Sequence, residues 1–97
     1  MDLARTFESI VIIFNPNSTG DAPKLAGQLR DRLGELLTYT PEIELQPTGH
    51  AGHAVTLAHD AAAGGGNVLI VSVSGDGGYN EVVNGVMRAG NPNAVCA

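Results

Sequence analysis

Residues 9–14 read SIVIIF, an unbroken run of mostly β-branched side chains that ends at the turn-forming sequence NPNSTG, residues 15–20. The run shows no alternation of polar and apolar residues, which is typical of a strand buried on both faces in a parallel sheet. A second run of this kind, VLIVSV at residues 68–73, is followed by SGDGG at residues 74–78. We therefore expect two buried strands, each with a polar, glycine-containing loop at its carboxyl end.

The segment after the first loop predicts a helix over residues 22–37, with Asp21 as its N-cap. Its leucines recur at spacings of three and four, which places them on one stripe of a helix. These leucines are Leu25, Leu29, Leu33, Leu36 and Leu37. We expect the whole stripe to lie in the core.

Shorter patterns predict the remaining elements. Residues 42–46 alternate polar and apolar side chains, as an edge strand does, and alanines over residues 52–63 predict a helix with a small-residue face. A third helix is expected to open near Tyr79 and to end near Gly90, and residues 94–97 begin a last strand. Strands and helices thus alternate, which predicts an α/β fold: a three-layer, Rossmann-like open parallel sheet with flanking helices. Because that strand breaks off, we expect the fold to be truncated.

The composition excludes several classes of protein. A chain of 97 residues has room for one domain, and five basic against ten acidic residues give a formal net charge of −5. This balance argues against a nucleic-acid partner, because phosphates require a basic surface. The only cysteine, Cys96, excludes an internal disulfide or a cysteine-based zinc site and fits the cytoplasmic location that we expect.

The loop at residues 74–78 is the expected site of chemistry. In open parallel sheets, ligands bind beyond the carboxyl ends of the strands. Gly75, Gly77 and Gly78 would let backbone amides approach an anion closely, and the N-terminus of the following helix points to the same place. Phosphate is the expected ligand, although neither a P-loop nor a dinucleotide fingerprint is present.

Asp76 lies inside this loop, where its carboxylate would repel phosphate unless its charge is offset. Either a bridging Mg²⁺ offsets it, or the carboxylate accepts a proton from an attacking hydroxyl. Both alternatives indicate phosphoryl transfer. The competing interpretation is that Asp76 and the glycines only form a tight turn that caps the third helix.

Three motifs together resemble the diacylglycerol kinase catalytic domain family, which includes the sphingosine kinases and bacterial lipid kinases. Ser74-Gly75-Asp76-Gly77 and the NEVVNG of residues 80–85 are similar to the family's Gly-Gly-Asp-Gly-Thr and its Asn-Glu helix ending in Asn-Gly. Asn15-Pro16 with Ser18 and Gly20 is similar to Asn-Pro-x-Ser-Gly. Thr48, Gly52 and Ala54 match Thr-x-x-x-Gly-x-Ala. Gly78 departs from the family, since most members have Thr there, and Thr19 is an insertion in the first loop.

This resemblance implies that residues 1–97 are the N-terminal nucleotide-binding lobe of a lipid kinase, whose β-rich, C-terminal lipid-binding lobe would lie outside this chain. The enzyme would use ATP and Mg²⁺ to phosphorylate the hydroxyl of a diacylglycerol or a sphingoid-like lipid. Asp76 would be the catalytic residue or the Mg²⁺ ligand, and the isolated chain is expected to be inactive. The nucleotide-binding residues implied are Asn15, Pro16, Ser18, Gly20, Thr48, Ser74, Gly75, Asp76, Gly77, Gly78, Asn80 and Glu81.

Two alternatives stay open. One is a lobe of an NAD kinase or phosphofructokinase-like enzyme, against which the NEVVNG sequence argues, and the other is a non-catalytic nucleotide-binding module, which Gly78 keeps open. The expected partners are a nucleotide, a lipid acceptor held by the missing lobe, and a membrane surface in transient contact. An unpaired sheet edge and apolar face also favour self-association as a dimer. His50, His53 and His59 do not share one helix face, so we expect surface histidines and no metal site there.

Overall fold

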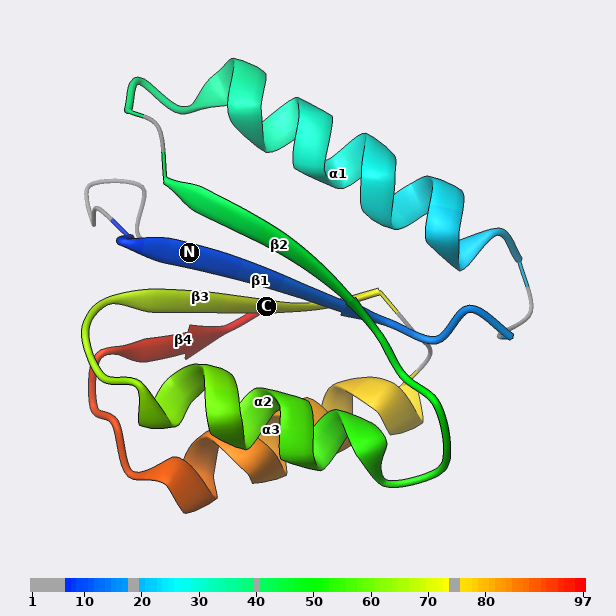
Figure 1. The fold of residues 1–97 in the computed structure, drawn as a ribbon, viewed down its shortest axis with the longest axis vertical. Helices are drawn as coiled ribbons and strands as arrows, with labels where there is room; N and C mark the ends of the chain where they lie inside the picture. The colour runs from blue at the N-terminus through cyan, green and yellow to red at the C-terminus, as the bar shows by residue number, and fades with distance from the viewer. Residues whose placement is uncertain (1–6, 18–19, 40, 74–75) are drawn as a thin grey trace.

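The computed structural model describes residues 7–17, 20–39, 41–73 and 76–97, and of Asp76 the backbone alone (Figure 1). Strands and helices alternate along these residues, which confirms the predicted order of elements. The elements are β1 (Ser9–Phe14), α1 (Ala22–Leu36), β2 (Glu42–Pro47), α2 (His53–Ala63), β3 (Val68–Val73), α3 (Asp76–Ala89) and β4 (Ala94–Cys96). No helix of these ranges is long and apolar enough to cross a membrane.

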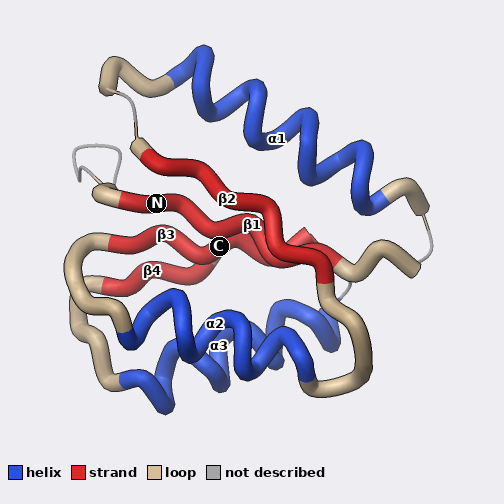
Figure 2. Tube along the Cα trace, in the orientation of Figure 1, coloured by secondary structure: helices blue, strands red, loops and turns tan. Residues whose placement is uncertain are grey.

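The strands form one four-stranded sheet in the order β2-β1-β3-β4, and every neighbouring pair is parallel. The two apolar runs are the central strands β1 and β3, and the alternating segment β2 is at an edge, as predicted. Helix α1 covers one face of the sheet, whereas α2 and α3 cover the other (Figures 1 and 2). This arrangement is the predicted open parallel sheet in three layers.

The order of the strands reverses between β1 and β3. From β1 the chain goes out through α1 to β2, and it then crosses back through α2 to β3 on the other side of β1. The connections that leave β1 and β3 therefore lead to helices on opposite faces of the sheet. Such a reversal opens a crevice beyond the carboxyl ends of these two strands.

Each face of the sheet has its own hydrophobic cluster, because alternate side chains of a strand point to opposite faces. On the α1 face, Ile10, Ile12 and Leu69 pack with Ala22 and Ala26 of the helix. On the other face, the strands meet α2 and α3. The buried residues of that second cluster are Val11, Ile13, Ala54, Ala58, Ala62, Val68, Ile70, Val82 and Val86.

The prediction that all five leucines of α1 lie in the core is wrong for two of them. Leu25 is 52% exposed and Leu36 is 65% exposed. Ala22 and Ala26 are buried instead, and Leu29, Leu33 and Leu37 pack partly against them. The helix contacts the sheet through a narrower stripe than its leucines cover: Leu25 lies about 80° from Leu33 around an axis with 3.6 residues per turn.

Helix α3 begins at Asp76, which corrects the expected start near Tyr79. Gly77 and Gly78 therefore belong to the first turn of the helix and not to a loop before it. The two glycines made the sequence a poor helix former at this point. The conformational cost of glycine applies chiefly in the middle of a helix, and a first turn, whose N–H groups have no partner within the helix, accepts it more readily.

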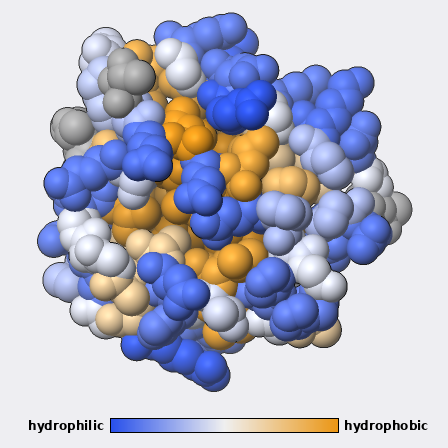
Figure 3. Space-filling model, in the orientation of Figure 1, coloured by the Kyte–Doolittle hydropathy of each residue, from blue (hydrophilic) through white to orange (hydrophobic). Residues whose placement is uncertain are grey.

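Not all of the apolar surface of the sheet is covered by helices. Helix α1 packs over β1 and β2, and it leaves Val71, Val73 and Val95 only partly buried on the same face. Figure 3 shows apolar side chains near the centre of one face of the molecule, with hydrophilic residues both among and around them. The dimer expected from an unpaired sheet edge and apolar face stays a prediction.

Helices α2 and α3 approach each other closely at Gly85, the last residue of the NEVVNG sequence. A Cβ atom at Gly85 would contact the carbonyl oxygen of Val55 and would lie 2.9 Å from Cβ of Ala58 and 3.0 Å from the backbone nitrogen of His59. Contacts this short are not tolerated without movement of the backbone. The predicted small-residue face of α2 thus packs against α3 as well as against the sheet.

We predict that Gly85→Ala lowers the free energy of unfolding by about 1–3 kcal/mol, the usual cost of overpacking. Gly34→Ala is the matched control, because a Cβ atom at Gly34 would meet no atom within 4 Å. In the last turn of α1, where Gly34 lies, that change should raise the free energy of unfolding by up to about 1 kcal/mol. Urea denaturation followed by circular dichroism measures both, and equal stabilities of the two variants would contradict the close packing.

Candidate functional site

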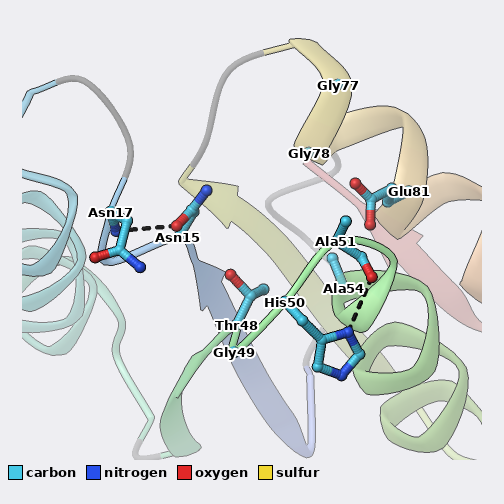
Figure 4. Close-up of a pocket in the computed structure, with 10 residues that line it drawn as sticks. All are labelled: Asn15, Asn17, Thr48, Gly49, His50, Ala51, Ala54, Gly77, Gly78 and Glu81. Atoms are coloured by element: carbon cyan, nitrogen blue, oxygen red, sulfur yellow. Dashed lines mark hydrogen bonds between the residues drawn. The ribbon is translucent and has the colours of Figure 1, made fainter.

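A cavity of about 450 Å³ opens beyond the carboxyl ends of β1, β2 and β3, where the strand order reverses (Figure 4). Three segments form its walls: the turn after β1, the segment between β2 and α2, and the first turns of α3. Its lining residues are Asn15, Asn17, Thr48, Gly49, His50, Ala51, Ala54, Gly77, Gly78 and Glu81.

The turn after β1 presents a side-chain amide to the cavity. Oδ1 of Asn15 accepts a hydrogen bond of 2.9 Å from the backbone N–H of Asn17, which closes a local turn of the kind that Asn favours. Figure 4 shows the other end of the Asn15 amide, Nδ2, turned away from Asn17. With Oδ1 engaged, the side chain offers the donor Nδ2 to a ligand.

The segment after β2 carries a hydroxyl to the same place. Thr48 N–H donates to the carbonyl oxygen of Phe14 at 2.9 Å, so the pairing of β1 and β2 continues one residue beyond Pro47. This bond holds Thr48 beside the end of β1. Asn15 and Thr48 thus come from neighbouring parallel strands, and their side chains lie on adjoining parts of the wall in Figure 4.

Two helices begin at the cavity. Ala54 is in the first turn of α2, and Gly77 and Gly78 are in the first turn of α3. The first N–H groups of a helix have no partner within it and carry a partial positive charge. No side chain caps the start of α2, where Gly52 is the N-cap residue. The walls therefore favour an anionic ligand.

The preference of the described wall for an anionic ligand does not come from its charged side chains. Glu81 is the one carboxylate among the ten lining residues, and none of them is Lys or Arg. Attraction for an anion must come from backbone N–H groups, from the helix N-termini, or from a bound cation.

Elsewhere, burial raises the pKa of the Cys96 thiol on β4, a residue that does not line the cavity.

The structure brings together five of the residues that the sequence suggested, namely Asn15, Thr48, Gly77, Gly78 and Glu81. Pro16, Gly20 and Asn80 are described but do not line the cavity. Ser18, Ser74 and Gly75 lie outside the described residues, as does the side chain of Asp76, so their predicted roles stay predictions. Among the described residues, no group of three or more His, Cys, Asp or Glu could hold a metal ion.

Sequence reasoning did not select Asn17, Gly49, His50, Ala51 or Ala54 as site residues, although all five line the cavity. Ala54 is the last residue of the Thr-x-x-x-Gly-x-Ala motif, and this is the one signal by which the sequence could have indicated it. The segment after β2 carried a weaker signal, since every connection at the carboxyl edge of a parallel sheet is a candidate wall. His50 and His53 also stack, with ring centroids 4.6 Å apart and planes inclined by 12°.

Comparisons with known proteins agree with this geometry. Residues 9–97 match the family model described as the diacylglycerol kinase catalytic domain. The crystal structure of a diacylglycerol kinase from Bacillus anthracis str. Sterne is similar, with a TM-score of 0.56 and 26% sequence identity. The match covers 84% of this chain and 28% of that one. A search of curated proteins finds no significant match.

The family match confirms the resemblance drawn from the three motifs and favours it over an NAD kinase or phosphofructokinase-like lobe. The similar crystal structure supports the same assignment for the fold. The chain therefore belongs to the diacylglycerol kinase catalytic domain family.

Proposed function

We propose that this chain is the nucleotide-binding lobe of an ATP-dependent lipid kinase. The observation that carries the proposal is the cavity at the strand reversal, into which two helix N-termini and the side chains of Asn15 and Thr48 project. The walls suit an anionic, hydrogen-bonding ligand of small-molecule size, and membership of the family supports ATP as that ligand.

The triphosphate is the part of ATP that these walls would bind. N–H groups at the start of α3 would donate to phosphate oxygens, as they do at other anion-binding helix N-termini. A Cβ atom at Gly77 would meet nothing within 4 Å, so packing does not require a glycine there. Close approach of a phosphate to the backbone would explain why a glycine is present at this position. The Thr48 hydroxyl and the Asn15 amide would add hydrogen bonds from the opposite wall.

A divalent cation would complete the site. A triphosphate beside Glu81, with no Lys or Arg in the described wall, needs positive charge from another source. Carboxylate oxygens are hard ligands of the kind that Mg²⁺ prefers, and Glu81 and Asp76, the first residue of α3, would supply them. Bound Mg²⁺ would neutralise the charge that develops on the transferred phosphoryl group.

The proposed reaction is transfer of the γ-phosphoryl group of ATP to the hydroxyl of a diacylglycerol or sphingoid-like lipid. The match covers only 28% of the solved relative, so we assign the lipid site to the remainder of the enzyme. That remainder would also make the contact with a membrane surface. Asp76 would either accept the proton of the lipid hydroxyl or hold the cation. As the proton acceptor the carboxylate would be needed for catalysis more than for nucleotide binding, whereas as a cation ligand it would support both.

We predict that Asp76→Asn, made in the protein that contains both lobes, lowers lipid phosphorylation by about a hundredfold or more, the usual contribution of a general base. Binding of MgATP should change far less if Asp76 is the base, and it should weaken together with activity if Asp76 holds the cation. Radiolabelled phosphate transfer measures activity, and calorimetry measures binding. Asp31→Asn is the control, because Asp31 is exposed on α1 outside the cavity. Unchanged activity in Asp76→Asn would favour a non-catalytic nucleotide-binding module.

We also predict that Thr48→Val raises the Kd for MgATP about tenfold without changing the melting temperature. A hydrogen bond to a charged group contributes about 1.5–3 kcal/mol, and 1.4 kcal/mol corresponds to a factor of ten. Thr56→Val, on the exposed side of α2, is the matched control and should bind as the wild type does. Equal affinities of the Thr48 and Thr56 variants would remove Thr48 from the site.

A further inference from the structure

The segment between β2 and α2 is closed by the side chain of His53, the first residue of α2. The backbone N–H of Gly49 donates to Nδ1 of His53 at 2.7 Å, and the N–H of His53 donates to the carbonyl oxygen of His50 at 3.1 Å. These two bonds run in opposite directions between the same short stretches of chain. They close residues 49–53 into a compact turn.

The hydrogen bond defines the protonation state of the ring. A backbone N–H can only donate, so Nδ1 of His53 must carry a lone pair. Nδ1 is therefore the acceptor in this contact, and Nε2 is the ring nitrogen left to donate. A side chain that lacks an acceptor at this position would leave the Gly49 N–H without its partner.

This turn has little other support at the start of α2. Thr48 N–H bonds to Phe14 at the end of the sheet, but Gly52 makes no side-chain cap and has a φ of 81°, which few residues other than Gly adopt. The ring of His50 stacks on that of His53 at 4.6 Å. His50 Nδ1 also lies 2.9 Å from the carbonyl oxygen of Ala51, and Val55 N–H donates to that of Gly52 at 3.2 Å. Neither contact ties Gly49 to the helix, which the His53 ring does.

The residues that this turn holds are walls of the cavity. Thr48, Gly49, His50 and Ala51 line it in sequence, and His53 itself does not. A shift of the turn would displace the Thr48 hydroxyl relative to Asn15 on β1, and displacements of about 1 Å are enough to weaken a hydrogen bond substantially.

We propose that His53 is a positioning residue of the nucleotide site: its Nδ1 holds the Gly49 N–H and thereby, together with the bond from Thr48 to Phe14, sets the place of the Thr48 hydroxyl in the cavity. The proposal rests on the proposed function, because it explains how His53 would contribute to the binding of ATP. Its structural half, the bond from Gly49 to His53, does not depend on any ligand.

The structural half is tested without nucleotide by nitrogen-15 NMR of the chain at neutral pH. We expect an unprotonated Nδ1 at His53, and a Gly49 amide that exchanges with solvent more slowly than in His53→Phe. A proton on Nδ1, or equal exchange rates at Gly49 in the two proteins, would overturn the proposal before any ligand is added.

The functional half is tested by two variants that separate the acceptor from the ring. His53→Phe keeps a ring to stack on His50 but lacks the acceptor, whereas His53→Asn lacks the ring but places Oδ1 where Nδ1 was. We expect the Kd for MgATP to rise about five- to tenfold in His53→Phe, in line with loss of one hydrogen bond, and less than threefold in His53→Asn. Calorimetry measures both.

Controls keep the outcomes distinct. His59→Phe, on the same helix but outside the lining, should bind as the wild type does, and melting temperatures verify that each variant is folded. If His53→Phe does not fold, His53→Ala takes its place. Equal affinity of the wild type and both His53 variants would overturn the positioning role alone. A wild type that binds no MgATP would overturn the proposed function, and with it the role of His53 in binding.

Discussion

The cavity depends on the parallel pairing of β1 with β2 on one side and with β3 on the other. Parallel pairing puts the carboxyl ends of all three strands at one edge of the sheet, and it requires a crossover helix between each strand and the next. Because β1 lies in the middle, its crossover and that of β3 go to opposite faces. Asn15, Thr48 and Gly77, which are far apart in the sequence, meet at this edge for that reason.

The anion site proposed for this acidic chain poses an electrostatic problem, because its positive charge would have to come from backbone groups. The net charge is −5, and the described wall contains a carboxylate but no Lys or Arg. Helix N-termini carry partial positive charge without a basic side chain that would fill part of the cavity. This charge acts only within about the first turn of each helix. A site built in this way depends on a cation whenever its ligand carries several charges.

The sequence was sufficient for the parts of the fold that obey a strong local pattern. Unbroken apolar runs predicted the central strands, and alternation predicted the edge strand β2. The leucines of α1 were a poorer indicator, because the width of the buried stripe depends on how the helix sits on the sheet, and Leu25 and Leu36 fall outside it. The start of α3 was misplaced since Gly77 and Gly78 are poor helix formers that a first turn nevertheless accepts.

The site was predictable where it coincided with a motif. Asn15 and Thr48 were selected by their motifs, and the structure places them together on the wall of one cavity. Asn17 and His50 lacked such a signal: Asn17 reaches the wall through a turn closed on Asn15, and the ring of His50 stacks on His53, which does not line the cavity. Contacts of that kind are set by the tertiary structure and leave no regular spacing in the chain.

Gly85 shows how a residue outside the lining can control the dimensions of a ligand site. At this glycine α2 and α3 nearly touch, and both helices begin at the cavity one to three turns away. Because Gly85 has no side chain, the two helices can lie this close, and their distance sets the separation of the two walls that they form. A larger residue at this position would push the two helices apart and so change the width of the cavity, without changing any residue of its wall.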